Sequence, residues 1–156
     1  MRKAFLALAT LQLVAVIAQF YFATFGAFQR PIPAGGSMGA LEPHVINGTM
    51  IIPLLGLVVT VVAAIARAGG RMIWWSVTPV LVVIAQLFVV FPVAELFGFT
   101  AEQTTTGAHV AMGFHAILGL VLLLASVRAF QGARALASGA AQAPAATAPQ
   151  AHAETH

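Results

Sequence analysis

Four long apolar stretches alternate with short polar segments along the chain. Each exceeds the roughly 20 residues that a helix needs to cross about 30 Å of hydrocarbon, and none carries Asp, Lys or Arg in its middle. Because backbone polar groups in lipid must be satisfied within the span, we predict that the stretches are helices. They cover, approximately, residues 4–28, 44–66, 72–97 and 107–130. The expected fold is all-α, a transmembrane four-helix bundle.

Three prolines interrupt the predicted spans. Pro53 lies in the second span, and Pro79 and Pro92 lie in the third. A proline inside a helix lacks the backbone N–H and clashes with the preceding turn, so each should kink its helix or interrupt the regular hydrogen bonding nearby.

The basic residues gather at one end of this layout. Arg30 alone falls at the other end, which also holds Glu42, Glu95 and Glu102. The positive-inside rule therefore places both chain termini in the cytoplasm, and we expect a multi-pass protein of the bacterial cytoplasmic (inner) membrane. The six basic residues of the cytoplasmic side are Arg2, Lys3, Arg67, Arg71, Arg128 and Arg134.

The last twenty residues differ sharply from the rest of the chain. Residues 137–156 are mostly Ala, Pro, Gln and Thr, with almost no large apolar side chain. Such a segment cannot bury enough apolar surface to fold alone. We predict a four-helix transmembrane domain over residues 1–136 and a disordered cytoplasmic tail over 137–156.

Composition excludes several other classes of protein. The chain is 60% hydrophobic and 7% charged, whereas a soluble domain carries about a quarter charged residues. It has no cysteine, which excludes disulfides, thiolate metal sites, iron–sulfur clusters and covalently attached c-type haem. The net charge of +3 is scattered over helix ends and forms no basic face for nucleic acid. The expected partner is the lipid bilayer.

Polar residues recur in the two halves of the chain. Gln19 in the first span matches Gln86 in the third, at an offset of 67 residues. His44 in the second span matches His109 in the fourth, at an offset of 65 residues. We infer that the bundle is built from two repeated helical hairpins, related by an axis along the membrane normal.

The repeated histidines suggest a cofactor. Polar residues within spans usually face the bundle interior, and under the repeat His44 and His109 face a common axis near the extracytoplasmic side. One imidazole on each side of the iron is the ligation that a b-type haem requires. Gly48 and Gly113 follow their histidines by one helical turn, on the same face. Their missing side chains would let the macrocycle approach the backbone.

Three further residues complete the predicted haem site or its surroundings. Gln19 and Gln86 lie in the outer halves of their helices, where they would hydrogen-bond to the ligands. Arg30 either pairs with a haem propionate or is a loop charge at the level of the lipid headgroups.

His115 is the alternative ligand in the fourth span. It follows His109 by six residues, about 240° round the helix and therefore on a different face. Its repeat partner is Met50, and methionine also ligates haem iron. At its depth in the span His115 needs a hydrogen-bond partner, such as Gln86 or a backbone carbonyl.

Two other interpretations of the polar residues stay open. Histidines at helix starts can sit in the headgroup zone, and glutamines can join helices through hydrogen bonds worth about 1 kcal/mol, so the set can be structural. A zinc site would need a third or fourth ligand, and the chain has no Cys or Asp to supply it.

The placement of His44 and His109 at span starts, with basic helix ends, resembles an uncharacterised family of small four-helix membrane proteins of actinobacteria and related high-GC bacteria. The resemblance covers about residues 4–130. The layout is also similar to that of membrane b-type cytochromes, whose four-helix cores bind haem between histidines on facing helices. Those proteins usually hold two haems. This chain has no histidine near its cytoplasmic helix ends, so the resemblance implies a single outer haem.

We therefore expect a b-type cytochrome, or a haem-bearing subunit, with one haem b that passes electrons at the extracytoplasmic side. His44 and His109 are the expected axial ligands. Such a chain would be an electron-transfer protein rather than a stand-alone enzyme. The alternatives are a non-catalytic accessory subunit of a larger membrane complex and a carrier for a lipophilic molecule such as a quinone.

Overall fold

The computed structural model describes residues 1–29, 38–100 and 103–139. Within these residues the chain is helical and has no strand, and four helical segments are long and apolar enough to cross a membrane. The predicted all-α four-helix bundle is confirmed. The four segments are Arg2–Ala27, Gly39–Ile65, Gly70–Leu96 and Thr106–Ala137. Most of the predicted tail, from residue 140, and Arg30 lie outside the described residues.

The first and fourth segments are single α-helices, α1 (Arg2–Ala27) and α6 (Thr106–Ala137). Thr105 caps α6, because its side-chain oxygen accepts a hydrogen bond from the backbone N–H of Ala108. The second and third segments each change helix type along their length. The second segment consists of η1 (Gly39–Leu41), α2 (Glu42–Ile46), η2 (Asn47–Ile51) and α3 (Ile52–Ile65). The third segment consists of α4 (Gly70–Ala85), η3 (Gln86–Val90) and α5 (Phe91–Leu96).

Both η2 and η3 are π-helical turns, and each ends just before a proline. The N–H of Ile52 bonds to the carbonyl of Asn47, and the N–H of Phe91 bonds to the carbonyl of Gln86. Pro53 and Pro92 follow directly, and the wider turn accommodates rings that would clash with a regular α-helical turn. The predicted interruption is confirmed at these two prolines. Pro79 lies inside α4, which continues through it.

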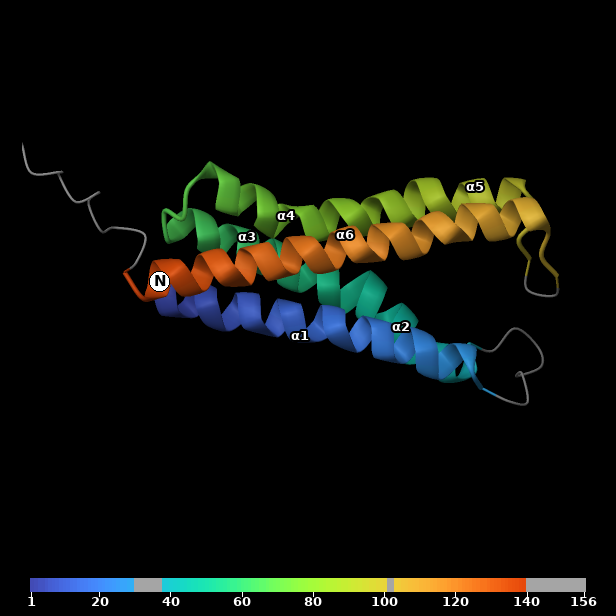
Figure 1. Cartoon of the computed structure of the whole chain (residues 1–156), viewed down its shortest axis with the longest axis horizontal. Helices are drawn as coiled ribbons and strands as arrows, with labels where there is room; N and C mark the ends of the chain where they lie inside the picture. Colours follow the sequence, from blue (N-terminus) through green and yellow to red (C-terminus); the bar gives the residue numbers. More distant parts are fainter. Residues whose placement is uncertain (30–37, 101–102, 140–156) are drawn as a thin grey trace, which may run out of the picture.

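A tight turn joins α3 to α4. Gly69 has φ +87° and Arg67 has φ +54°, both in the left-handed region, which glycine adopts without steric cost. The turn lies beside the start of α1 and the end of α6 (Figure 1). We call this the basic end of the bundle, because Arg2, Arg71 and Arg134 also lie there.

The four segments pack closely from the basic end to the middle of the bundle. One buried cluster near the basic end joins Phe5 and Ala9 of α1 to Val59 of α3 and Ala133 of α6. A second cluster lies further along and is made of Val16, Ile52, Val82, Val83 and Leu122. Beyond it the bundle divides, with α2 and η2 packing on α1, and α5 and η3 packing on α6. Figure 1 shows these two arms separating toward the opposite end.

Candidate functional site

His44 and His115 lie against each other where the two arms diverge. His44 comes from α2 and His115 from α6. Their ring centroids are 5.9 Å apart and the ring planes are inclined by 60°. Phe91 of α5 packs on His115, with centroids 5.4 Å apart. The two half-buried imidazoles thus form a contact between the two arms.

Gln86 holds His115 by two hydrogen bonds. Its amide nitrogen donates to the carbonyl of His115 at 3.0 Å, and its amide oxygen lies 3.0 Å from Nδ1 of the same residue. Because an amide oxygen can only accept, Nδ1 of His115 carries the proton and Nε2 keeps its lone pair. The predicted hydrogen-bond partner of His115 is confirmed.

Gln19 holds His44 in a related way. Nδ1 of His44 lies 3.1 Å from the backbone carbonyl of Gln19, so this nitrogen too must be the donor. The side-chain amide of Gln19 donates to the carbonyl of His44 at 3.0 Å and lies 3.3 Å from His44 Nε2. In both arms, therefore, a glutamine amide donates to the carbonyl of the histidine.

Asn47 extends the network around His44. Its amide nitrogen donates to Oε1 of Gln19 and to the backbone carbonyl of Ala15, both at 2.8 Å. The side chain is 8% exposed. Asn47 is not among the residues predicted for the site, although its position three residues after His44, on the same helix face, is a signal that could have indicated it.

The anchored rings share one chemical property. Each imidazole donates its Nδ1 proton to a fixed acceptor, which sets the ring orientation and leaves Nε2 as the basic nitrogen. Histidines that bind metals are held in this way by a hydrogen bond to the other ring nitrogen. Within the described part of the chain, Nε2 of His115 has no hydrogen-bond partner.

His109 lies elsewhere on α6. It is exposed and belongs to the first turns of the helix, where its backbone N–H bonds to the carbonyl of Thr105. The structure brings His44 to His115 rather than to His109, because the core-facing side of α6 passes through Ala108, Ala111 and His115. His44 makes its ring contact with His115, whereas the repeat predicted that His44 and His109 would face a common axis.

The two predicted clearance glycines have different surroundings. A Cβ on Gly48 would lie 2.5 Å from Nε2 of Gln19, so the missing side chain makes room for that amide. A Cβ on Gly113 would meet no described atom within 4 Å, and the residue is exposed. Gly48 is therefore part of the glutamine–histidine contact, whereas Gly113 is not crowded.

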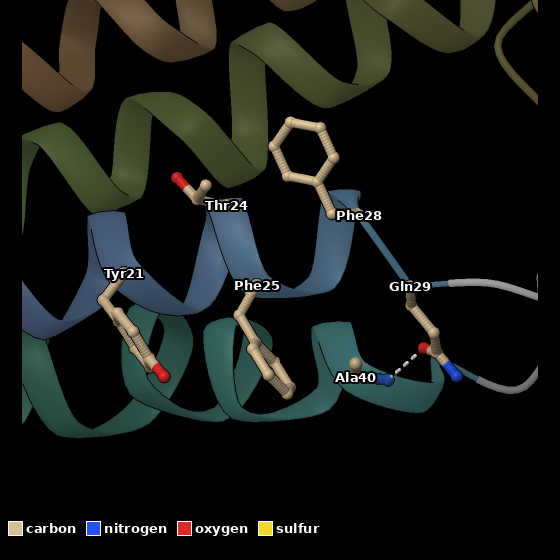
Figure 2. A pocket seen from close by; sticks show the side chains of 6 residues that line it. All are labelled: Tyr21, Thr24, Phe25, Phe28, Gln29 and Ala40. Atoms are coloured by element: carbon tan, nitrogen blue, oxygen red, sulfur yellow. Dashed lines mark hydrogen bonds between the residues drawn. The ribbon is translucent and has the colours of Figure 1, made fainter.

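A separate hollow lies at the other end of α1 from Arg2. It has a volume of about 430 Å³, and half of its lining residues are aromatic. Figure 2 shows Tyr21 and Phe25 extending to one side of α1 and Phe28 to the other, while the N–H of Ala40 donates to Oε1 of Gln29. Tyr21 and Phe25 stack with centroids 6.0 Å apart. None of the predicted site residues lines this hollow.

The comparisons with known proteins give one match. A family model described as a family of unknown function (DUF6220) matches residues 19–94. The matched segment contains Gln19, His44, Asn47 and Gln86, and it ends before α6. No curated protein and no solved structure matches the chain. Over the matched residues the chain is similar to a family without an assigned activity, and the cytochrome-like layout stays a prediction.

Proposed function

We propose that the chain is a multi-pass protein of the bacterial cytoplasmic membrane that binds one b-type haem between His44 and His115. It would act as a cytochrome, or a haem-bearing subunit, in electron transfer at the extracytoplasmic side. The observation that carries the proposal is that the imidazole rings of His44 and His115 are each held by a hydrogen bond from Nδ1. Both Nδ1 atoms donate to fixed acceptors, so each Nε2 keeps a lone pair that a ligated metal could use; Nε2 of His115 has no partner among the described residues, and Nε2 of His44 contacts the Gln19 amide.

The contact between the two rings supports a shared site. The ring centroids of His44 and His115 are 5.9 Å apart. These are the two side chains that would hold the haem.

The donor set favours haem over a bare metal ion. Among the described residues there is no group of three or more His, Cys, Asp or Glu side chains that could hold an ion. Haem brings its own equatorial nitrogens, so two histidines complete its coordination. Bound haem would supply reversible one-electron transfer.

The surrounding residues would then orient the ligands. Gln86 keeps the His115 ring in place through Nδ1, and the backbone carbonyl of Gln19 does the same for His44. The 3.3 Å contact between Nε2 of His44 and the Gln19 amide is the one that ligation would replace. Gln19 would retain its bonds to the His44 carbonyl and to Asn47.

The distribution of charge supports the orientation in the membrane. Arg2, Arg67, Arg71 and Arg134 lie at the basic end. Glu42 and Glu95 belong to α2 and α5, at the opposite end. The positive-inside rule then puts the basic end in the cytoplasm and the histidine pair in the outer half of the bilayer.

The test is whether the purified protein carries haem. We would express the full chain in haem-sufficient cells, purify it in mild detergent and quantify haem b by the pyridine haemochrome method. The proposal predicts one haem per chain and a Soret band that shifts on reduction by dithionite. A colourless protein would overturn the proposal, and stable co-purification with a larger complex would then favour an accessory subunit.

A further inference from the structure

A groove of about 440 Å³ runs between α1 and α6 near the basic end. Leu13 of α1 faces Val127 and Phe130 of α6 across its apolar part. Gln131, Arg134 and Ser138 follow along α6 toward the end of that helix. The groove is therefore apolar in its deeper part and polar where it reaches the basic end.

The charge around the groove is of one sign. Arg134 is exposed and makes no ion pair with the described residues. The carboxylates of the described residues, Glu42 and Glu95, belong to α2 and α5 at the opposite end of the bundle. An anion bound beside Arg134 would meet no carboxylate in the described part of that end.

We propose that this groove binds an anionic phospholipid of the leaflet at the basic end. Its phosphate would be held by Arg134, whose planar guanidinium suits bidentate phosphate binding. Gln131 and Ser138 also line the groove as polar residues, and the Ser138 hydroxyl donates to the carbonyl of Ala135. An acyl chain would lie along Leu13, Val127 and Phe130.

The order of side chains along the groove supports a lipid rather than a free phosphate ion. The apolar residues begin about one helical turn from Arg134 and continue toward the bilayer centre, which is the direction an acyl chain takes from its headgroup. Basic pockets between transmembrane helices on the cytoplasmic side are sites for anionic headgroups. The inference rests on the membrane orientation proposed above and does not depend on the haem.

The matched variants are Arg134→Gln and Arg128→Gln. Both remove one positive charge from an exposed position of α6, but Arg128 does not line the groove. We would measure the unfolding midpoint of the full chain in detergent by the fluorescence of Trp74 and Trp75. Phosphatidylglycerol, phosphatidylcholine and inorganic phosphate would each be added separately. The readout reports lipid binding whether or not haem is present.

We expect phosphatidylglycerol to raise the midpoint of the wild type and of Arg128→Gln by several degrees. Arg134→Gln should lose most of this shift, and the other two additives should produce little of it in any variant. An equal loss in both variants would overturn the inference in favour of diffuse charge attraction. An equal shift with phosphatidylcholine or with inorganic phosphate would overturn it as well, because the headgroup charge or the acyl chain would then be irrelevant.

Discussion

Gln86 makes two hydrogen bonds to His115. Its amide nitrogen donates to the backbone carbonyl of His115, and its amide oxygen accepts from Nδ1. The residue is 8% exposed and is the first residue of the π turn η3. The π turn adds one residue to the helix, so it changes the direction in which the following side chains point. The change of helix type and the anchoring of His115 therefore occur at the same residue.

Replacing Gln86 by methionine should destabilise the fold. Gln86→Met keeps the side-chain length but leaves the Nδ1 proton of His115 without a partner, while the His115 carbonyl keeps its bond within α6. The expected cost is about 1–3 kcal/mol in the free energy of unfolding. The exposed Gln131→Met is the control, because Gln131 makes no side-chain hydrogen bond with the described residues. SDS titration followed by circular dichroism measures the free energy of unfolding of both variants. Equal stability of the two variants would show that the Gln86 bonds contribute nothing.

Substitution by alanine should change the free energy of unfolding differently at Gly48 and at Gly113, the two glycines predicted to give the macrocycle room. Gly48→Ala places a Cβ 2.5 Å from Nε2 of Gln19, so this amide must move and lose its hydrogen bond to the His44 carbonyl, at a cost of about 0.5–1.5 kcal/mol. Gly113→Ala meets open space, so the higher helix propensity of alanine should leave stability unchanged or raise it by about 0.5–1 kcal/mol. The same unfolding titration compares them. A Gly113→Ala variant that loses as much stability as Gly48→Ala would contradict the surroundings described for these residues.

Gln12 should be replaceable by leucine with a gain in stability. It is 2% exposed, and neither its amide nitrogen nor its oxygen has a hydrogen-bond partner among the described residues. Leaving such a group unsatisfied costs about 1–3 kcal/mol, and leucine is of similar size without that cost. Thermal unfolding should therefore show a higher midpoint for Gln12→Leu than for the wild type. A lower midpoint would mean that the amide is satisfied, for example by an internal water molecule.

The number and approximate positions of the helices could be predicted from the sequence because four apolar stretches are each long enough to cross a bilayer. The end of α6 could not be predicted in this way. The apolar stretch stops near Phe130, but the helix continues to Ala137, and Ala133 packs in the same cluster as Phe5. Hydropathy marks where a helix leaves the hydrocarbon, whereas packing decides where the helix ends.

The site could be predicted in part. Gln19, Gln86 and His44 were identified because polar residues in apolar spans are costly and tend to face one another. The ring contact of His44 could not be predicted, because the repeat matches His44 to His109, at an offset of 65 residues. In the structure the ring of His44 contacts His115, at an offset of 71, and Gln86 bonds to the same histidine. Sequence matching aligns residue types along the chain and does not show which side of α6 meets α2.

The most direct measurement is the reduced-minus-oxidised visible spectrum of His115→Ala beside that of His109→Ala. Both variants lose one imidazole from α6, but only His115 contacts His44. The proposed ligation predicts that His109→Ala keeps the Soret and α bands of a bis-histidine b haem and that His115→Ala loses them. Loss of the bands in His109→Ala, with a wild-type spectrum in His115→Ala, would contradict the assignment and return the ligand to His109.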